Sequence, residues 1–355
     1  INARTASTSI NQYYSGGAVD DSAALVEATA GDTNTGGSNT VAAYQVQTGV
    51  DVTLFGNSWG AGTWSRGAWN SRATIVVQSE LLRLWTHDTF GEDLIFNIKD
   101  GPIFYWDASG GASQRGIYLK DLTNAADSPI VAKQVMVSDV DRHVIAFGCN
   151  PVGSNIQDPL LIRFSSQEAP QDWRPLTTNT AGDLRIGSGT AIVQAVETRQ
   201  EILVFTDQAL HSMQFIGPPY TFGINRISEN ITIRSPNAAV AVGDSVYWMG
   251  KDQFYVYRGN VNQLECTVRE RILTDINDDQ LDKVFAGVNS GYQEIWWFYP
   301  SINSNDIDKY VIYNYDANIW YYGTLSRTAW VDRGVLDYPM AAGNDGVLYN
   351  HEYEI

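Results

Sequence analysis

The sequence predicts an all-β protein, a β-propeller with six blades, from three observations. The 355 residues include 11 Trp, 19 Tyr, 12 Phe and 31 Gly, a composition typical of short strands joined by tight turns. Pairs of apolar strands separated by a polar turn recur from about residue 45 onward. Segments with the 3.6-residue apolar period of a helix are scarce, which excludes helical repeats.

The spacing of these strand pairs identifies the repeat. The first strands of successive pairs begin at residues 94, 144, 202, 246, 295 and 347, so the steps run from 44 to 58 residues. A spacing near fifty with at least two strands per unit indicates propeller blades, because leucine-rich and ankyrin repeats are shorter.

The last copy, residues 340–355, holds at most one hairpin, so its strand edges would remain open unless an N-terminal strand completes it. The candidate strands are residues 50–55, 74–78 and 81–85. We therefore expect N- and C-terminal strands to share one blade, made from residues 45–92 and 340–355. This arrangement gives six blades, with seven as the alternative.

Residues 1–44 differ from the rest of the chain. They are small and polar and lack apolar periodicity, so we interpret them as an N-terminal arm ordered by a partner, with a flexible terminus as the alternative. Residues 45–355 form the predicted propeller domain. Short helices are predicted around residues 22–28 and over residues 275–286, the latter with an acidic first turn. The chain begins at Ile1 without Met or a signal peptide, which we interpret as trimming or processing.

Charge restricts the classes of partner. Lys and Arg total 23 against 40 Asp and Glu, a net charge of −17, which argues against a protein that grips nucleic acid phosphates or anionic membrane. No run of 18 apolar residues occurs, so we expect no membrane-spanning helix. Cys149 and Cys266 could form one disulfide, but two free thiols are the favoured interpretation.

No motif indicates catalysis. His87, His143, His211 and His351 have no metal-ligand spacing, and each is interpreted as a structural histidine. The GxSxG, Walker A and GxGxxG patterns are absent. The acidic stretch 275–280 lacks the Gly and Glu of a calcium loop and is better explained by helix capping. We therefore expect no catalytic residue, no cofactor and no metal.

The tryptophans allow several interpretations. Three Trp side chains lie in the Gly-rich segment 56–70, where they could pack on the propeller rim, contact another subunit or bind a ligand. Trp296 and Trp297 are adjacent in a strand and face opposite sides, so at least one should be core. Five residues are candidate subunit contacts: Trp59, Trp64, Trp69, Arg327 and Trp330.

Several blocks together resemble virion structural proteins of tailed phages, and the most similar group is the β-propeller tail hub or nozzle proteins of short-tailed phages, including the packaged-DNA stabilisation proteins. The resemblance spans about residues 45–355. Its blocks are residues 161–173, 179–183, 202–207, 214–219, 241–250, 294–300, 313–316 with Trp320, and 327–330.

This resemblance implies a structural, non-enzymatic virion protein that is made in the host cytoplasm. Copies would form a ring, typically a homohexamer, below the portal and adaptor, lining part of the DNA exit channel and holding packaged DNA. Six copies would carry about −100 in charge, so an acidic wall would repel the duplex and keep it mobile. We expect carboxylates at the lumen and no sequence-specific DNA binding.

The alternative is a glycan-binding or glycan-cleaving propeller used in host-receptor recognition. Residues 165–173 are weakly similar to the Asp-box turn of sialidases but lack its Gly and Thr. Glycoside cleavage would also need two carboxylates at a defined separation, which the sequence alone does not place.

Overall fold

The computed structural model describes residues 23–26, 43–46, 82–111 and 113–353 of the chain. The chain divides into two compact units, residues 1–83 and 84–355. In the first unit, β1 (Ala23–Val26) pairs antiparallel with β2 (Ala43–Val46). The helix predicted around residues 22–28 is therefore wrong. A segment this short has too few residues to nucleate a helix, whereas a partner strand satisfies its backbone.

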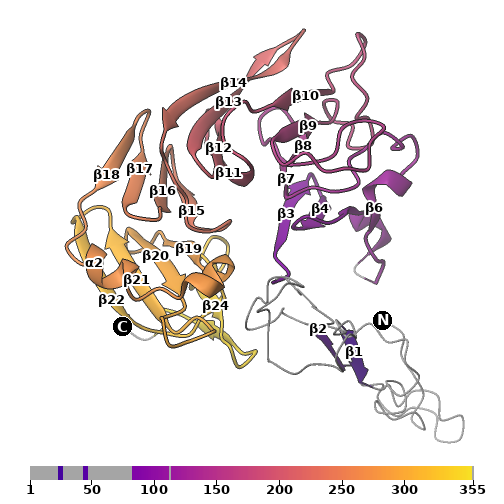
Figure 1. The fold of residues 1–355 in the computed structure, drawn as a ribbon. Helices are drawn as coiled ribbons and strands as arrows, with labels where there is room; N and C mark the ends of the chain where they lie inside the picture. The colour runs from indigo at the N-terminus through magenta and orange to yellow at the C-terminus, as the bar shows by residue number, and fades with distance from the viewer. Residues whose placement is uncertain (1–22, 27–42, 47–81, 112, 354–355) are drawn as a thin grey trace, which may run out of the picture. The chain divides into compact units, whose positions relative to one another are not determined.

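The second unit is a six-bladed β-propeller, which confirms the predicted fold. Six antiparallel sheets follow one another in chain order, and Figure 1 shows them arranged in a ring with β3, β7, β11, β15 and β19 toward the centre. The first sheet contains β3 (Trp85–Phe90), β4 (Asp93–Ile98), β5 (Ile103–Trp106) and β6 (Ile117–Tyr118). The second contains β7 (Gln134–Val137), β8 (Val144–Phe147), β9 (Leu161–Phe164) and β10 (Gly182–Arg185). The third contains β11 (Ile192–Glu197), β12 (Ile202–Thr206), β13 (Ala209–Gly217) and β14 (Thr221–Glu229).

The last three sheets continue the same order. The fourth sheet contains β15 (Ala239–Val242), β16 (Ser245–Met249), β17 (Phe254–Tyr257) and β18 (Val261–Leu264). The fifth contains β19 (Phe285–Asn289), β20 (Glu294–Tyr299), β21 (Lys309–Asn314) and β22 (Ile319–Thr324). The sixth contains β23 (Ala329–Val331), β24 (Met340–Ala342) and β25 (Leu348–Asn350).

In the first five sheets, the recurring strand pairs of the sequence are the second and third strands. Middle strands that are covered on both faces, such as β8 and β17, carry the continuous apolar runs that made the repeat visible. The start predicted for the sixth copy at residue 347 is wrong, because β24 at Met340 is the second strand and β25 is the third. The segment Met340–Ala342 is short and small-sided, so it has no apolar run.

The closing blade stays a prediction. Residues 50–55 and 74–78 lie outside the described residues. The assignment of residues as far as 92 to the closing blade is wrong, because β3 (Trp85–Phe90), which begins at the end of the third candidate, pairs with β4 in the first sheet. The sixth sheet, as far as the structure describes it, runs β23–β24–β25.

The predicted helix over residues 275–286 is only partly present, because a 3₁₀ helix covers its middle, β19 begins at Phe285 and the nearest α-helix ends before residue 275. The α-helix α2 spans Arg269–Leu273, and a 3₁₀ helix, η3, spans Asp278–Lys283. Between them, Ile276 forms a β-bridge with Ser301, which holds the backbone extended where the prediction required a helix. Asn277 then caps η3 by accepting a hydrogen bond from the Asp279 N–H at 3.0 Å.

The core lies between neighbouring sheets. Trp297 is fully buried and crosses to the fourth sheet, where its indole N–H donates to the Ala238 carbonyl at 2.9 Å. Trp296 is also buried, and its ring stacks on Trp330 of the sixth sheet at 5.2 Å. The prediction that at least one of this pair is core is confirmed, and both are.

Two glutamine side chains join neighbouring sheets at their innermost strands. Gln134 donates to the Ala195 carbonyl at 2.8 Å and accepts from the Ala195 N–H at 2.7 Å. Gln194 does the same to Ala239, at 2.9 and 3.0 Å. These two contacts, called the glutamine clasps below, let a buried amide satisfy a backbone donor and acceptor that the sheet ladder leaves free.

Replacing Gln194 by Leu is expected to destabilise the propeller by about 2–4 kcal/mol, because Leu keeps the volume but leaves the N–H and C=O of Ala239 buried without partners. Urea unfolding followed by tryptophan fluorescence measures the change. Gln200→Leu, at an exposed turn position, is the control and should stay within about 0.5 kcal/mol of wild type. Equal stability of the two variants would contradict the role assigned to the clasp.

Candidate functional site

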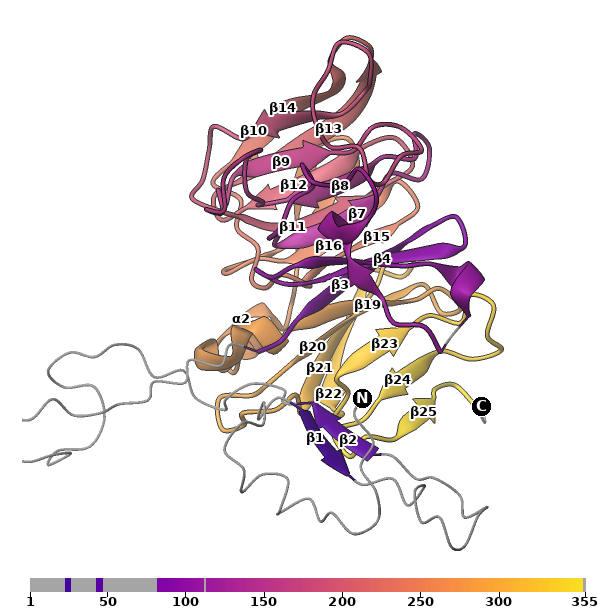
Figure 2. The same cartoon turned by 90° about the vertical axis from the view of Figure 1, so that its right-hand side faces the viewer.

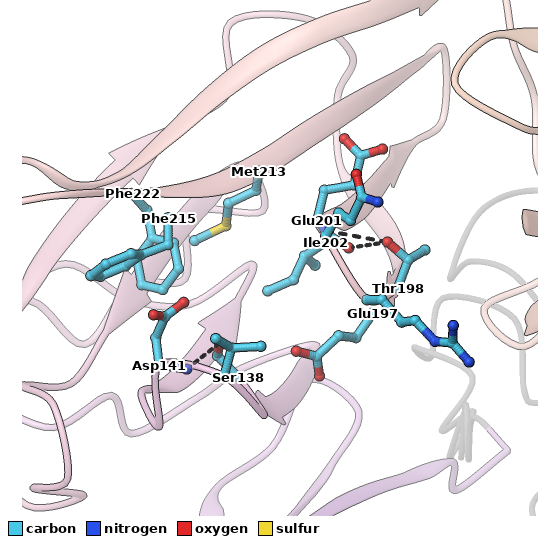
Figure 3. Close-up of a pocket in the computed structure, with 12 residues that line it drawn as sticks. Ser138, Asp141, Glu197, Thr198, Glu201, Ile202, Met213, Phe215 and Phe222 are labelled. Carbon is cyan, nitrogen blue, oxygen red and sulfur yellow. Dashed lines mark hydrogen bonds between the residues drawn. The ribbon is translucent and has the colours of Figure 1, made fainter. Parts of the chain in front are cut away.

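A pocket of about 240 Å³ lies where the second and third sheets meet. The turn between β7 and β8 contributes Ser138 and Asp141, the turn between β11 and β12 contributes Glu197 and its neighbours, and the β13–β14 hairpin contributes Phe215 and Phe222. Figure 3 shows Asp141 beneath the rings of Phe215 and Phe222. The Glu197 carboxylate extends into the pocket from the end of β11. The pocket thus combines carboxylates with an aromatic wall.

Glu197 is the most perturbed of these carboxylates. Burial is the main cause that raises the pKa of Glu197 to about 7, and the charges of Asp139, Asp88 and Asp141 act in the same direction. The Asp139 N–H donates to Oε1 of Glu197 at 3.0 Å and opposes the rise. Burial also raises the pKa of Asp141. A carboxyl group that changes protonation near neutral pH is suited to proton transfer or to holding a cation.

Glu201, on the same turn, has a structural role. Its carboxylate accepts from the Tyr257 hydroxyl at 2.6 Å, from the Gln214 amide at 3.2 Å and from the Ser212 hydroxyl. Thr198 fixes the turn by donating to the Glu201 carbonyl at 2.7 Å. These bonds tie the third sheet to the fourth and occupy both Glu201 oxygens.

The aromatic wall is anchored by edge contacts. The Phe222 ring meets Phe164 at 4.9 Å, Phe215 at 5.6 Å and His143 at 5.2 Å between centroids. His143 is fully buried, and its Nδ1 lies 2.7 Å from the Ser165 carbonyl, to which it donates. Burial lowers the pKa of His143, so the ring is a neutral packing group.

Of the other three histidines, His211 and His351 have hydrogen-bond partners and His87 is exposed. His211 pairs with the Ser188 hydroxyl at 2.8 Å, His351 accepts from Arg327 Nε at 3.0 Å, and His87 lies on the exposed side of β3. Within the described ranges, no group of three or more His, Cys, Asp or Glu side chains is arranged to hold a metal ion.

Both cysteines are free thiols, as predicted. Burial raises the pKa of Cys149 to about 12 and that of Cys266 to about 11. Neither is therefore a reactive thiolate at neutral pH. None of the helices in the described part of the chain has the length and apolar character needed to cross a lipid bilayer.

Two of the five candidate subunit contacts can be placed. The Arg327 guanidinium lies over the Tyr349 ring at 4.1 Å. Trp330 donates from its indole to the Val288 carbonyl at 2.8 Å, so both residues hold the sixth sheet together or join it to the fifth. Trp59, Trp64 and Trp69 lie outside the described residues. A contact of any of the five with another subunit stays a prediction.

No sequence pattern predicted the acidic pocket. Its residues come from three hairpins between Ser138 and Phe222, so no local spacing unites them. With 40 Asp and Glu in the chain, a carboxylate by itself gives no signal. Only the packing of the second sheet on the third brings Asp141 and Glu197 to one pocket.

Replacing Glu197 by Gln is expected to stabilise the protein by about 1 kcal/mol at about pH 8.5 and to give no gain at about pH 5. The folded-state pKa of Glu197 lies above its ordinary value of 4.5, so its favourable contribution is complete below 4.5 and is lost as the pH rises through about 7. Thermal unfolding across this pH range measures the difference. The control is Glu92→Gln, because Glu92 is exposed and its replacement reports the effect of removing one charge elsewhere. If both variants showed the same dependence of stability on pH, the prediction would be contradicted.

Known families and curated proteins give no match to this chain. No family model matches it. No curated protein matches it either.

Solved structures are similar to this chain only at low identity and low TM-score. The computationally designed Ika8 protein matches with 10% identity and a TM-score of 0.44, over 76% of this chain and 71% of that one. The extracellular domain of the putative one-component system BT4673 from B. thetaiotaomicron matches with 8% identity and a TM-score of 0.46, over 77% of this chain but only 34% of that chain. The dihydro-heme d1 dehydrogenase NirN in complex with DHE matches with 10% identity and a TM-score of 0.45, over 76% of this chain and 53% of that chain. Likeness at this level carries no argument about activity.

Proposed function

We propose that the chain is a non-enzymatic structural propeller of a tailed-phage virion, a subunit of a hub or nozzle ring around the DNA exit channel. The observation that carries the proposal is a projecting hairpin with an apolar end. Strand β12 pairs with β13 only as far as Met213, and beyond it β13 and β14 continue as a two-stranded ribbon. Figures 1 and 2 both show this ribbon at the periphery of the propeller.

The end of the ribbon, called the hairpin tip below, consists of Phe215, Ile216, Pro218, Pro219 and Tyr220. Tyr220 is 74% exposed, Ile216 57% and Phe215 41%. Residues 214–221 carry no charge. Apolar surface gathered on a protrusion is a feature of proteins that bind other proteins, since water disfavours it in a free monomer. This fits an assembly role and supports the ring.

The charge of the chain fits the same role. At −17 per copy, the charge argues against binding a duplex by neutralising its phosphates, which suits a conduit through which DNA must move. Partners would be further copies in a ring, the adaptor and other tail proteins, and the site of action would be the virion. The sequence resemblance to the nozzle group supports this finer proposal.

Negative-stain microscopy of the purified chain tests the proposal. We expect closed rings with about six-fold symmetry. The same particles, imaged at higher resolution, should present carboxylates to the lumen. Particles that remain single propellers, or rings whose lumen is neutral or basic, would contradict the proposal.

A second candidate function is favoured by one observation, the acidic pocket. Glu197 has a pKa near 7 and lines the same pocket as Asp141, and glycoside cleavage uses two carboxyl groups of which one has a raised pKa. In this alternative, Glu197 is the general acid and Asp141 the second carboxylate. The test is whether the protein releases reducing sugar from host polysaccharide. Release by the wild type that is lost in Glu197→Gln would favour the enzyme over the nozzle. A wild-type protein that releases no sugar would eliminate the enzyme.

A further inference from the structure

We propose that the hairpin tip of one copy inserts into a groove between the fourth and fifth sheets of the next copy, so that copies join head to tail. The inference deepens the proposed function, on whose ring it rests. It assigns the two surfaces that build that ring.

The tip is held in place before binding. The Phe215 ring packs on Phe222, which is buried against the second sheet, and the Thr221 hydroxyl donates to the Thr180 carbonyl at 3.0 Å. Gly217 and Thr221 are paired at the end of the ribbon. Because the ribbon is fixed at its base, presenting Ile216 and Tyr220 to a partner costs little additional ordering.

The groove, called the outer groove below, has a volume of about 610 Å³ and lies between the outer strands β18 and β22. The Trp320 indole donates to the Glu265 carbonyl at 2.9 Å, and its ring packs on Phe254 at 4.7 Å. Leu264 and Ile319 add apolar surface at the rim. This volume lies within the range of about 300–1,000 Å³ typical of sites that enclose a bulky ligand, so it can receive an aromatic ring together with a neighbouring side chain.

Apolar surface continues from the outer groove along β22. Ile319, Tyr321 and Tyr322 are each nearly half exposed. The Arg271 guanidinium lies over the Tyr322 ring at 4.8 Å, which fixes that side chain. The tip and the outer groove with its β22 edge are therefore an apolar protrusion and an apolar recess on different parts of one chain.

Charge selects a second copy as the occupant. Two copies with −17 each repel one another, so contact between them is favoured where both surfaces carry little charge. The tip has no charged residue, and Glu265 is the one charged side chain among the residues that line the outer groove. A basic partner would instead be drawn to carboxylates, which neither surface concentrates.

The tip and the outer groove are two different surfaces of one chain, so copies that join through them can build a ring. The tip belongs to the third sheet and the outer groove to the fourth and fifth, so a copy that offers its tip keeps its own groove free. Such heterologous contacts propagate from copy to copy and close when the rotation per copy divides a full turn.

Two variants and their mixture test the assignment. The tip variant is Ile216→Asp with Tyr220→Asp, and the groove variant is Ile319→Asp; a second groove variant, Gln263→Trp, fills the outer groove without adding charge. Val335→Asp, at a fully exposed position on neither surface, is the matched control. Oligomer mass is measured by mass photometry at equal concentrations, and circular dichroism checks that each variant is folded.

Wild type and Val335→Asp are expected to form rings, whereas the tip variant and both groove variants are expected to lose the ring and run as single chains. An equimolar mixture of the tip variant with a groove variant should give dimers and nothing larger, because one intact tip and one intact groove remain. Rings that persist in the tip variant would overturn this inference and leave the proposed function standing. A groove variant that still assembles would point to tip-to-tip contact and would also overturn it. A wild-type protein without rings would instead overturn the proposed function.

Discussion

Trp297→Ala is expected to lower the free energy of unfolding of the propeller by about 4–5 kcal/mol, because a large core side chain is lost together with its hydrogen bond. The Trp297 ring is fully buried and packs on Phe254 at 5.0 Å and on Trp320 at 6.1 Å. Its loss opens a cavity between the fourth and fifth sheets. It also leaves the Ala238 carbonyl, which accepts the indole hydrogen bond, without that donor.

Urea unfolding with circular dichroism as the probe measures this loss, since the fluorescence of the variant is itself altered. Trp297→Phe separates the two contributions, because it keeps most of the packing and removes only the donor; about 1–3 kcal/mol is expected. Trp85→Ala is the matched control, since Trp85 lies on the innermost strand of the first sheet and is 46% exposed. A loss for Trp297→Ala no greater than that for Trp85→Ala would contradict the assignment.

Arg163→Met is expected to destabilise the propeller by about 3 kcal/mol and to lower its Tm by about 10 °C. Arg163 is 1% exposed, and its guanidinium donates to the carbonyls of Asn150 at 3.2 Å, Asp127 at 2.5 Å and Trp173 at 3.1 Å. Met fills the space but leaves these carbonyls without their donor. Burial lowers the pKa of Arg163, and the three carbonyls offset the cost of placing its charge in the core.

Differential scanning calorimetry measures the shift. Arg185→Met is the control, because Arg185 makes one exposed ion pair, with Asp158 at 2.6 Å, and surface pairs contribute about 0–1 kcal/mol. If Met at position 163 were tolerated as well as at position 185, the loops that carry Asn150 and Asp127 would be held by other contacts.

Much of the fold could be predicted because its signal is local. Middle strands such as Val246–Met249 and Phe254–Tyr257 are buried on both faces and must be apolar throughout. Each of them is therefore visible in the sequence as an apolar run. The signal fails where a strand is too short to carry it, as at Met340–Ala342. It also fails where a distant partner decides the backbone, as Ser301 does for Ile276.

The site could not be predicted in the same way. Asp141 and Glu197 meet only because two sheets pack together, and nothing in their own sequence neighbourhoods differs from an exposed turn. A weaker signal did exist elsewhere. Arg163 interrupts an apolar strand and Gln194 lies in another, and a polar residue in a buried run indicates a side chain with fixed hydrogen-bond partners.

The placement of the core between sheets has a consequence for how the molecule comes apart. The largest buried cluster spans the third to fifth sheets, whereas the sixth is joined through a small one around Trp296 and Phe298. Cooperativity therefore passes from each sheet to its neighbours, and within the described residues the sixth sheet shares only the small cluster with the fifth. We expect partial unfolding to begin at the sixth sheet and to leave the sheets from the third to the fifth folded.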